Sequence, residues 1–170
     1  VKRSGPGGHG RTFNPFSRTS LEAVMEHFTP VFKDLQIRAQ FHDSWEYDTD
    51  SCPELFDKFC EKRQYDLREY VDALAGGSSP DVNARVKYDV QMTLAELALE
   101  DFIIPWTDWC HELGQLSRNQ AHGSPGNLLD LYAAADIPET EVFRCITPDT
   151  PLLSKFASSA AHVAGKSLTS

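Results

Sequence analysis

The stretch Leu35-Gln-Ile-Arg-Ala-Gln-Phe41 alternates apolar with polar side chains and runs directly into the polar cluster His42-Asp-Ser-Trp-Glu46. Such alternation over about four to eight residues is typical of a half-buried β-strand. A helical pattern precedes it between residues 20 and 32, where apolar side chains recur at helical spacing. The sequence therefore predicts a helix, and then a strand that ends in a group of polar side chains.

Strands and helices alternate along the rest of the chain. Three more strands are predicted at 115–121, 136–143 and 166–170. Helical periodicity falls between them, at about 53–60, 67–74, 79–113, 128–135 and 151–164. Strands that alternate with helices imply parallel pairing through right-handed crossovers, so the predicted fold class is α/β. An open sheet could hold about four parallel strands, but the abrupt polar end of the last strand favours a partial (β/α) TIM-type barrel.

Composition excludes several classes of function. The 170 residues suggest one domain, and 41% hydrophobic residues suffice for a core. With 16 Lys and Arg against 25 Asp and Glu, the net charge is −9, and the sequence shows no basic stripe. Such a surface repels phosphate backbones, so we expect no nucleic-acid partner. Because no apolar run reaches the roughly 18–20 residues that span a bilayer, we expect no membrane partner. The chain starts at Val1 rather than Met, which indicates processing from something longer.

The acid at the end of the first strand is the first candidate for chemistry. Glu46 follows Trp45 and lies close to Asp43 in sequence. An aromatic neighbour can desolvate a carboxylate and raise its pKa, which would make Glu46 a general acid at neutral pH. The alternative is an exposed loop acid beside a core tryptophan.

A pair of acids marks the 136–143 segment. Glu139 and Glu141 are two residues apart, so on a strand both side chains point to the same face. Two adjacent carboxylates repel unless a cation, sugar hydroxyls or a shared proton compensates, and the pair therefore suits a hard-cation or polyol site. A solvated edge strand is the alternative.

The 115–121 segment carries a third polar row. Arg118, Gln120 and His122 share parity and could hydrogen-bond a polar substrate. His122 precedes Gly123, so an ordinary turn residue is the competing interpretation. The carboxyl ends of parallel strands share one edge of a sheet, so we expect these rows of polar side chains to converge at a single mouth.

Several familiar chemistries are poorly supported. The chain contains no G-x-x-x-x-G-K-[ST] loop, no G-x-S-x-G elbow and no H-E-x-x-H helix. The four cysteines form neither a C-x-x-C pair nor a zinc spacing. Nucleotide binding, serine-hydrolase chemistry and zinc proteolysis are therefore disfavoured.

The ordered motifs resemble glycoside hydrolase family 106, the α-L-rhamnosidase family. The resemblance rests on His42-Asp-Ser-Trp-Glu46, a helix motif ending in Tyr65-Asp-Leu-Arg-Glu-Tyr70, Arg118-Asn-Gln-Ala-His-Gly123 and Asp136-Ile-Pro-Glu-Thr-Glu141. The opening Gly5-Pro-Gly-Gly8 with Asn14-Pro-Phe-Ser17 matches as well. The chain departs from the pattern at Gln64, where the helix motif of the family usually has glycine.

The resemblance implies a β/α-barrel catalytic domain that removes terminal α-L-rhamnose from glycans with inversion and depends on calcium. Glu46 would be the general acid, flanked by Asp43 and Trp45 in the substrate-binding region. Arg118, Gln120 and His122 would lie in the sugar pocket. Glu139 would contact substrate and, with Glu141, the calcium ion.

An inverting glycosidase needs two carboxyl groups about 6.5–9.5 Å apart with a water molecule between them. The run Ser159-Ala-Ala-His-Val-Ala-Gly-Lys166 resembles the approach to a strand that carries another essential acid in the family, yet the sequence ends at Ser170. We therefore expect residues 1–170 to be a single fragment of a larger catalytic domain. It would be inactive without the remainder of the parent chain, and that parent would be secreted or periplasmic.

Two other functions stay open at this point. One is another barrel glycosidase, such as a β-galactosidase-like retaining enzyme, with its carboxyl groups nearer about 5–5.5 Å apart. The other is a non-catalytic sugar- or calcium-binding module, because 10 Phe, 5 Tyr and 3 Trp could supply aromatic faces for a sugar. Helical spacing instead favours core positions for most of these rings.

Overall fold

A computed structural model describes residues 13–141 and 150–167 of the chain. Its sheet consists of β1 (Ala39–His42), β2 (Leu116–Asn119) and β3 (Ile137–Pro138), paired in parallel in the order β1-β2-β3. The register places Phe41 opposite Arg118, and Arg118 opposite Ile137. β2 is therefore the central strand, and the polar segments that follow all three strands share one edge.

The prediction of a partial TIM-type barrel with about four strands is wrong. The described residues form an open three-stranded sheet in a small α/β domain. The predicted fourth strand fails because Lys166 terminates the preceding helix: its N–H donates to Ala161 O after the left-handed Gly165. Residues 168–170 of that predicted strand lie outside the described residues.

The other predicted strands are shorter than the alternation suggested. Leu35 N–H donates to Phe32 O and Ile37 N–H to Leu35 O, so the first half of the 35–41 segment turns away from the preceding helix. The 136–143 segment keeps a two-residue strand, and residues 142 and 143 lie outside the described part, as does Gly5-Pro-Gly-Gly8.

The helices follow the predicted periodicity closely. They are α1 (Arg18–Phe32), α2 (Leu55–Arg63), the 3₁₀-helix η1 (Leu67–Tyr70), α3 (Val71–Leu74), α4 (Pro80–Leu97), the π-helix η2 (Ala98–Ile103), α5 (Ile104–Glu112), α6 (Leu128–Ala134) and α7 (Thr150–Val163). Side-chain oxygens cap several of them: Ser17 accepts from Ser20 N–H at α1 and Ser79 from Val82 N–H at α4.

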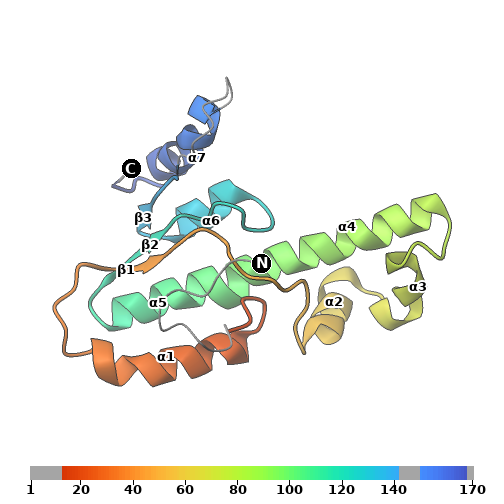
Figure 1. Cartoon of the computed structure of the whole chain (residues 1–170), viewed down its shortest axis with the longest axis horizontal. Coiled ribbons are helices and arrows are strands. Elements are labelled where there is room, and N and C mark those ends of the chain that lie inside the picture. The colour runs from red at the N-terminus through yellow and green to blue at the C-terminus, as the bar shows by residue number, and fades with distance from the viewer. Residues whose placement is uncertain (1–12, 142–149, 168–170) are drawn as a thin grey trace.

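Helices α4, η2 and α5 follow one another as one long rod (Figure 1). Pro105 lies in the first turn of α5, and the wide π-turns come directly before it. Ile104 N–H bonds Leu99 O, five residues earlier, so the backbone passes the proline without its missing donor breaking the helix.

The core is divided along this rod. The largest cluster of buried side chains lies between α1, η2, α5 and α6 and includes Phe102, Ile103, Trp106 and Tyr132. A second cluster joins Phe16 and Leu55 to the end of α4. The third, around Phe59 and Leu67, belongs to an arm that we define as α2, η1, α3 and the first half of α4. Figure 1 shows this arm extending away from the sheet.

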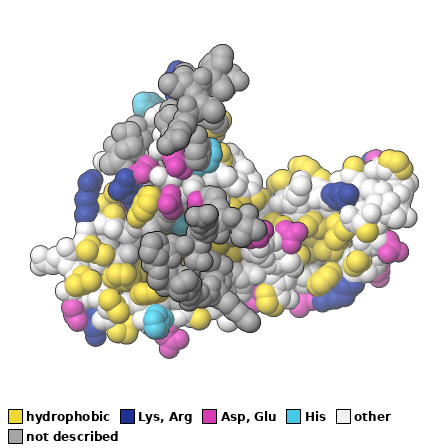
Figure 2. Space-filling view, in the orientation of Figure 1, with side chains coloured by type: hydrophobic (Ala, Val, Ile, Leu, Met, Phe, Trp, Pro, Cys, Tyr) yellow, Lys and Arg dark blue, Asp and Glu magenta, His cyan; other side chains and the backbone are white. Residues whose placement is uncertain are grey.

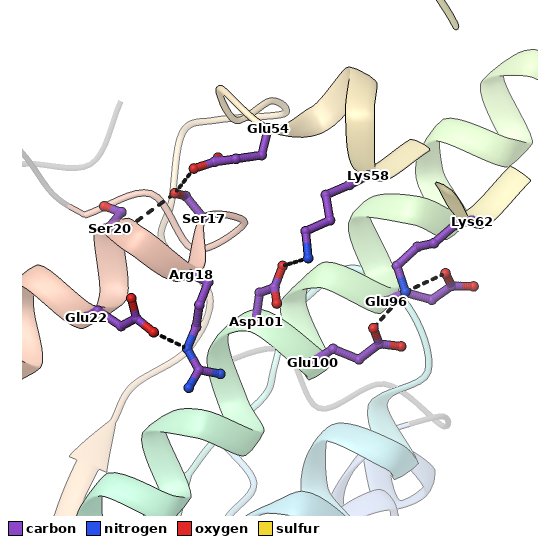
Figure 3. Close-up of polar contacts among 10 residues, drawn as sticks. All are labelled: Ser17, Arg18, Ser20, Glu22, Glu54, Lys58, Lys62, Glu96, Glu100 and Asp101. Carbon is purple, nitrogen blue, oxygen red and sulfur yellow. Dashed lines mark hydrogen bonds and ion pairs between the residues drawn. The ribbon is translucent and has the colours of Figure 1, made fainter. Parts of the chain in front are cut away.

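Ion pairs connect α2, in the arm, to the end of α4 and to η2 (Figure 3). Lys58 Nζ lies 3.4 Å from Asp101, and Lys62 Nζ lies 2.6 Å from Glu100 and 3.4 Å from Glu96. In the same view Ser17 Oγ donates to Glu54 Oε1 over 3.0 Å, which connects the start of α1 to the start of α2.

Hydrophobic side chains also reach the surface. Figure 2 shows hydrophobic side chains over α1 and again along the arm. Phe28 and Val31 on α1 and Tyr88 on α4 are among the exposed ones. None of the helices in the described ranges has the length and apolar character needed to cross a bilayer.

Candidate functional site

Backbone hydrogen bonds bring the segments that follow the three strands side by side. Gln120 N–H donates to His42 O over 3.1 Å, and Glu139 N–H donates to Asn119 O over 3.0 Å. Farther along, Trp45 N–H donates to His122 O over 2.8 Å. The segments that follow the three strands therefore lie side by side at the carboxyl edge of the sheet.

Glu139 is the centre of this edge. Its side chain is buried, with 6% of the residue exposed. Arg118 Nε donates to Oε2, and Gln120 Nε2 donates to Oε1 over 3.2 Å. The guanidinium compensates the buried carboxylate charge, which would otherwise be costly to remove from water. Arg118 and Gln120, which are two residues apart, thus both donate to the Glu139 carboxylate.

Arg118 has a second contact that fixes its position. Its guanidinium carbon lies 4.9 Å from the centre of the Phe41 ring, which is 49% exposed. A cation over an aromatic face is attracted by the ring quadrupole. The charged end of Arg118 is therefore held between β1 and the acid that follows β3.

Two buried acceptors at this edge lack donors. Gln120 Oε1 and Glu141 Oε2 are shielded from solvent and have no hydrogen-bond partner among residues 13–141 and 150–167. Gln120 as a residue is only 8% exposed. Buried acceptors are normally satisfied, so these two oxygens are suited to receive hydroxyl or other N–H or O–H donors of a ligand.

The same residues fit a calcium ion poorly. Calcium takes about six to eight oxygen ligands, several of them from carboxylates. Here Glu139 is already bound by Arg118, which leaves Glu141 as the other predicted acidic ligand. Within residues 13–141 and 150–167 no group of three or more acidic, histidine or cysteine side chains could hold a metal ion. Calcium binding stays a prediction that these residues do not carry by themselves.

The loop after β1 holds the remaining predicted residues. Glu46 is exposed, and so is Asp43, whose carboxylate accepts from Ser44 N–H over 2.8 Å. The Trp45 ring packs on the aromatic core, with centroids 4.9 Å from Tyr47 and 5.6 Å from Phe16. The assignment of Glu46 as general acid stays a prediction.

His122 lies in the turn after β2 and is partly buried. Its carbonyl accepts from Trp45, so this turn and the Glu46 loop are held together. The edge thus places Glu46 and His122 on neighbouring loops, and Arg118, Gln120 and Glu139 in one hydrogen-bonded group.

Sequence reasoning missed a buried polar network directly beneath the edge. His42 Nδ1 lies 2.8 Å from Asn119 Oδ1, and His42 Nε2 lies 3.1 Å from Tyr47 Oη. Burial lowers the pKa of His42, although the bond to Asn119 and the charge of Asp43 oppose that shift. Burial raises the pKa of Tyr47, because for a phenol, too, it disfavours the charged form. The position of His42 at the end of the predicted strand would have suggested a partner on a neighbouring strand, but not which residue.

Comparison with known proteins supports the fold. No protein-family model matches the chain, and no curated protein matches it by sequence. Among solved structures, a rhamnosidase from Novosphingobium sp. PP1Y is similar over 97% of this chain, with a TM-score of 0.76 and 21% sequence identity. The chain spans 18% of the length of that protein. At this identity the likeness establishes a rhamnosidase-like fold for the segment.

Proposed function

We propose that this chain is part of a glycoside hydrolase that removes terminal α-L-rhamnose from glycans with inversion. The observation that carries the proposal is the fold shared with a rhamnosidase over 97% of the chain. The polar edge of the sheet agrees with it, because a carboxylate, an amide and a guanidinium are arranged there around one point. These groups can bind the vicinal hydroxyls of a sugar.

In this proposal the residues divide the work of binding and proton transfer. Arg118, Gln120 and Glu139 orient the sugar through its hydroxyl groups, and the unsatisfied oxygens of Gln120 and Glu141 accept further hydroxyl hydrogens. Glu46, exposed on the adjoining loop, protonates the leaving glycosidic oxygen. The carboxylate that activates water is not among the residues assigned here, so it would come from elsewhere in the active protein.

The role of Glu46 is tested by Glu46→Gln in the full-length protein that contains this chain. Loss of a general acid typically lowers turnover by about 10²–10⁴-fold. The loss should be greatest for a methyl or sugar leaving group and much smaller for a nitrophenyl rhamnoside, whose leaving group needs little protonation. Asp48→Asn, an exposed acid on the same loop, is the matched control. Equal turnover of the methyl rhamnoside by Glu46→Gln and the parent would contradict the assignment.

Product stereochemistry separates this proposal from a retaining glycosidase. Proton NMR of the first-formed sugar should show the inverted anomer. The retained anomer would instead favour the β-galactosidase-like alternative.

Sugar binding by the 170-residue chain gives an independent measurement. Calorimetric titration with methyl α-L-rhamnoside should show binding that Glu139→Gln weakens and that Glu112→Gln, an exposed acid on α5, does not. Binding here, combined with no hydrolysis by the full-length protein, would indicate a non-catalytic sugar-binding module.

A further inference from the structure

The turn that carries Gln120 and His122 has an unusual backbone. Ala121, between them, has φ 50°, in the left-handed region that residues with a Cβ rarely adopt. Ala121 is fully buried. Its N–H donates to Asn119 Oδ1 over 3.1 Å, so the Asn119 side chain closes the turn from two residues earlier.

The oxygen that closes this turn is itself held by a histidine. Asn119 is fully buried, and its Oδ1 also lies 2.8 Å from His42 Nδ1. Since this oxygen accepts, Nδ1 of His42 carries the hydrogen and donates. Nε2 is then the acceptor, and the Tyr47 hydroxyl donates to it over 3.1 Å. Each polar atom of the neutral imidazole therefore has one partner of the right kind.

The surroundings of His42 favour this neutral form. The imidazole lies edge-on to Phe102, with centroids 4.9 Å apart, and 5.9 Å from Trp106. It stacks on Tyr47 with ring planes 8° apart. Aromatic walls on several sides fix the ring plane, which directs Nδ1 at Asn119. The charged group nearest to it in sequence is Asp43, which is exposed.

We propose that His42 is a positioning residue for the polar edge of the sheet: through Asn119 it holds the left-handed Ala121 turn, which sets the directions of Gln120 and His122. The effect on sugar binding rests on the proposed function, because Gln120 donates to Glu139 in the proposed sugar site. The positioning of the turn is independent of any ligand.

The first test measures the tautomer in the unmodified 170-residue chain. Nitrogen-15 NMR of His42 at neutral pH should report a protonated Nδ1 and an unprotonated Nε2. The opposite tautomer, with hydrogen on Nε2 and none on Nδ1, would overturn the proposal without any variant.

The second test uses a pair of substitutions with opposite expectations. His42→Phe fills the aromatic cage but donates nothing to Asn119, whereas His42→Asn places an amide N–H where Nδ1 was. In His42→Phe the Ala121 amide should exchange about tenfold faster or more, since Asn119 Oδ1 loses one of its two donors, and the Gln120 and His122 resonances should move. In His42→Asn the Ala121 amide should stay close to the parent. Unchanged exchange of Ala121 in His42→Phe, with α4 amides still protected, would overturn the proposal.

Binding of methyl α-L-rhamnoside separates this inference from the proposed function. If the unmodified 170-residue chain binds the sugar, His42→Phe should weaken binding by about tenfold, and the affinity of His42→Asn should lie within about twofold of the unmodified chain. If the parent does not bind it, the proposed function loses support, while the exchange and tautomer measurements still decide the role of His42. Weakened binding in His42→Phe without a change at Ala121 would count against the positioning role.

Discussion

At the scale of single residues, two of the described residues other than glycine have left-handed backbone. Gln64 has φ 64° at the C-cap of α2, and Ala121 has φ 50° in the turn beside the candidate site. The strain at Ala121 is held in place by buried hydrogen bonds. Gln64 is exposed, and its position is the one where glycine is usual in the resembled family. Replacing Gln64 by glycine would remove the backbone strain and, of the hydrogen bonds described, only the one from the Gln64 side chain to Glu61 O.

Gln64→Gly should stabilise the protein. Glycine adopts the left-handed conformation without the steric cost that a Cβ brings, and a gain of about 0.5–1 kcal/mol in the free energy of unfolding is expected. Urea denaturation measures it. Gln64→Ala, which keeps the Cβ and loses the side-chain bond, is the control and should not stabilise. A loss of stability in Gln64→Gly would show that the side-chain bond outweighs the backbone strain.

His42 should make stability depend on pH. Because burial lowers its pKa in the folded state, the unfolded chain takes up a proton first as the pH falls. The contribution of His42 is thus complete above its unfolded pKa of about 6.5 and is lost as the pH falls through the lower folded pKa. The free energy of unfolding should fall by at most about 1.4 kcal/mol per pH unit in that window. Denaturation between about pH 7.5 and 5 measures this slope, which His42→Gln should flatten and His162→Gln, at an exposed position of α7, should leave unchanged.

At the scale of elements, the helices were predictable and the strands were predictable only in place. Helical periodicity is a local property, so α1, α6 and the continuous run of α4, η2 and α5 lie within a few residues of their predicted bounds. The strands were predicted too long, because β1 begins only at Ala39 and Lys166 closes α7. The barrel prediction failed with them, since it depended on a fourth strand.

The candidate site was predictable in part, for the same reason. Parity along one strand placed Arg118 and Gln120 on a common face, and the shared edge of parallel strands brought them to Glu139. The pairing of His42 with Asn119 was not predictable, because these residues are 77 apart in sequence. The alternation also favoured Phe41 as buried, yet Phe41 is exposed and His42 lies among the core rings.

The N-cap of α1 joins two elements and should cost more to remove than an ordinary cap. Ser17 is buried, accepts from Ser20 N–H and donates to Glu54 (Figure 3). Ser17→Ala should lower the free energy of unfolding by about 2 kcal/mol, since a cap is worth about 1 kcal/mol and the hydrogen bond to the acid contributes a similar amount. The matched control is Ser79→Ala at the exposed cap of α4, with an expected loss of about 1 kcal/mol. Equal losses in the two variants would mean that the Glu54 contact contributes nothing.

At the scale of the whole molecule, the arm and the sheet have separate cores. Phe59, Leu67, Ala73 and Val86 form the arm cluster, and none of them belongs to the cluster beneath the sheet. Ion pairs from Lys58 and Lys62 provide part of the connection, and partly exposed ion pairs contribute little. The arm should therefore open more readily than the sheet.

Phe59→Ala tests this separation. Phe59 is fully buried, and truncating a buried Phe typically costs about 3–5 kcal/mol. We expect amide exchange to accelerate throughout the arm while β2 amides keep their protection. Phe56→Ala, only partly buried on the same helix, should have a much smaller effect. Equal acceleration in the arm and in β2 would show that the two regions unfold as one unit.

The pairing of β1 with β2 has a consequence for how the molecule is made. Residues 43–115 lie between the two strands, so β1 leaves the ribosome long before its partner exists. At about 5–20 residues per second, that delay is roughly 4–15 s. Helices close on local contacts within microseconds, whereas this parallel pairing must wait for synthesis and for closure of a long loop. The edge that carries Glu139 can therefore assemble only after the helices between β1 and β2 have been synthesised.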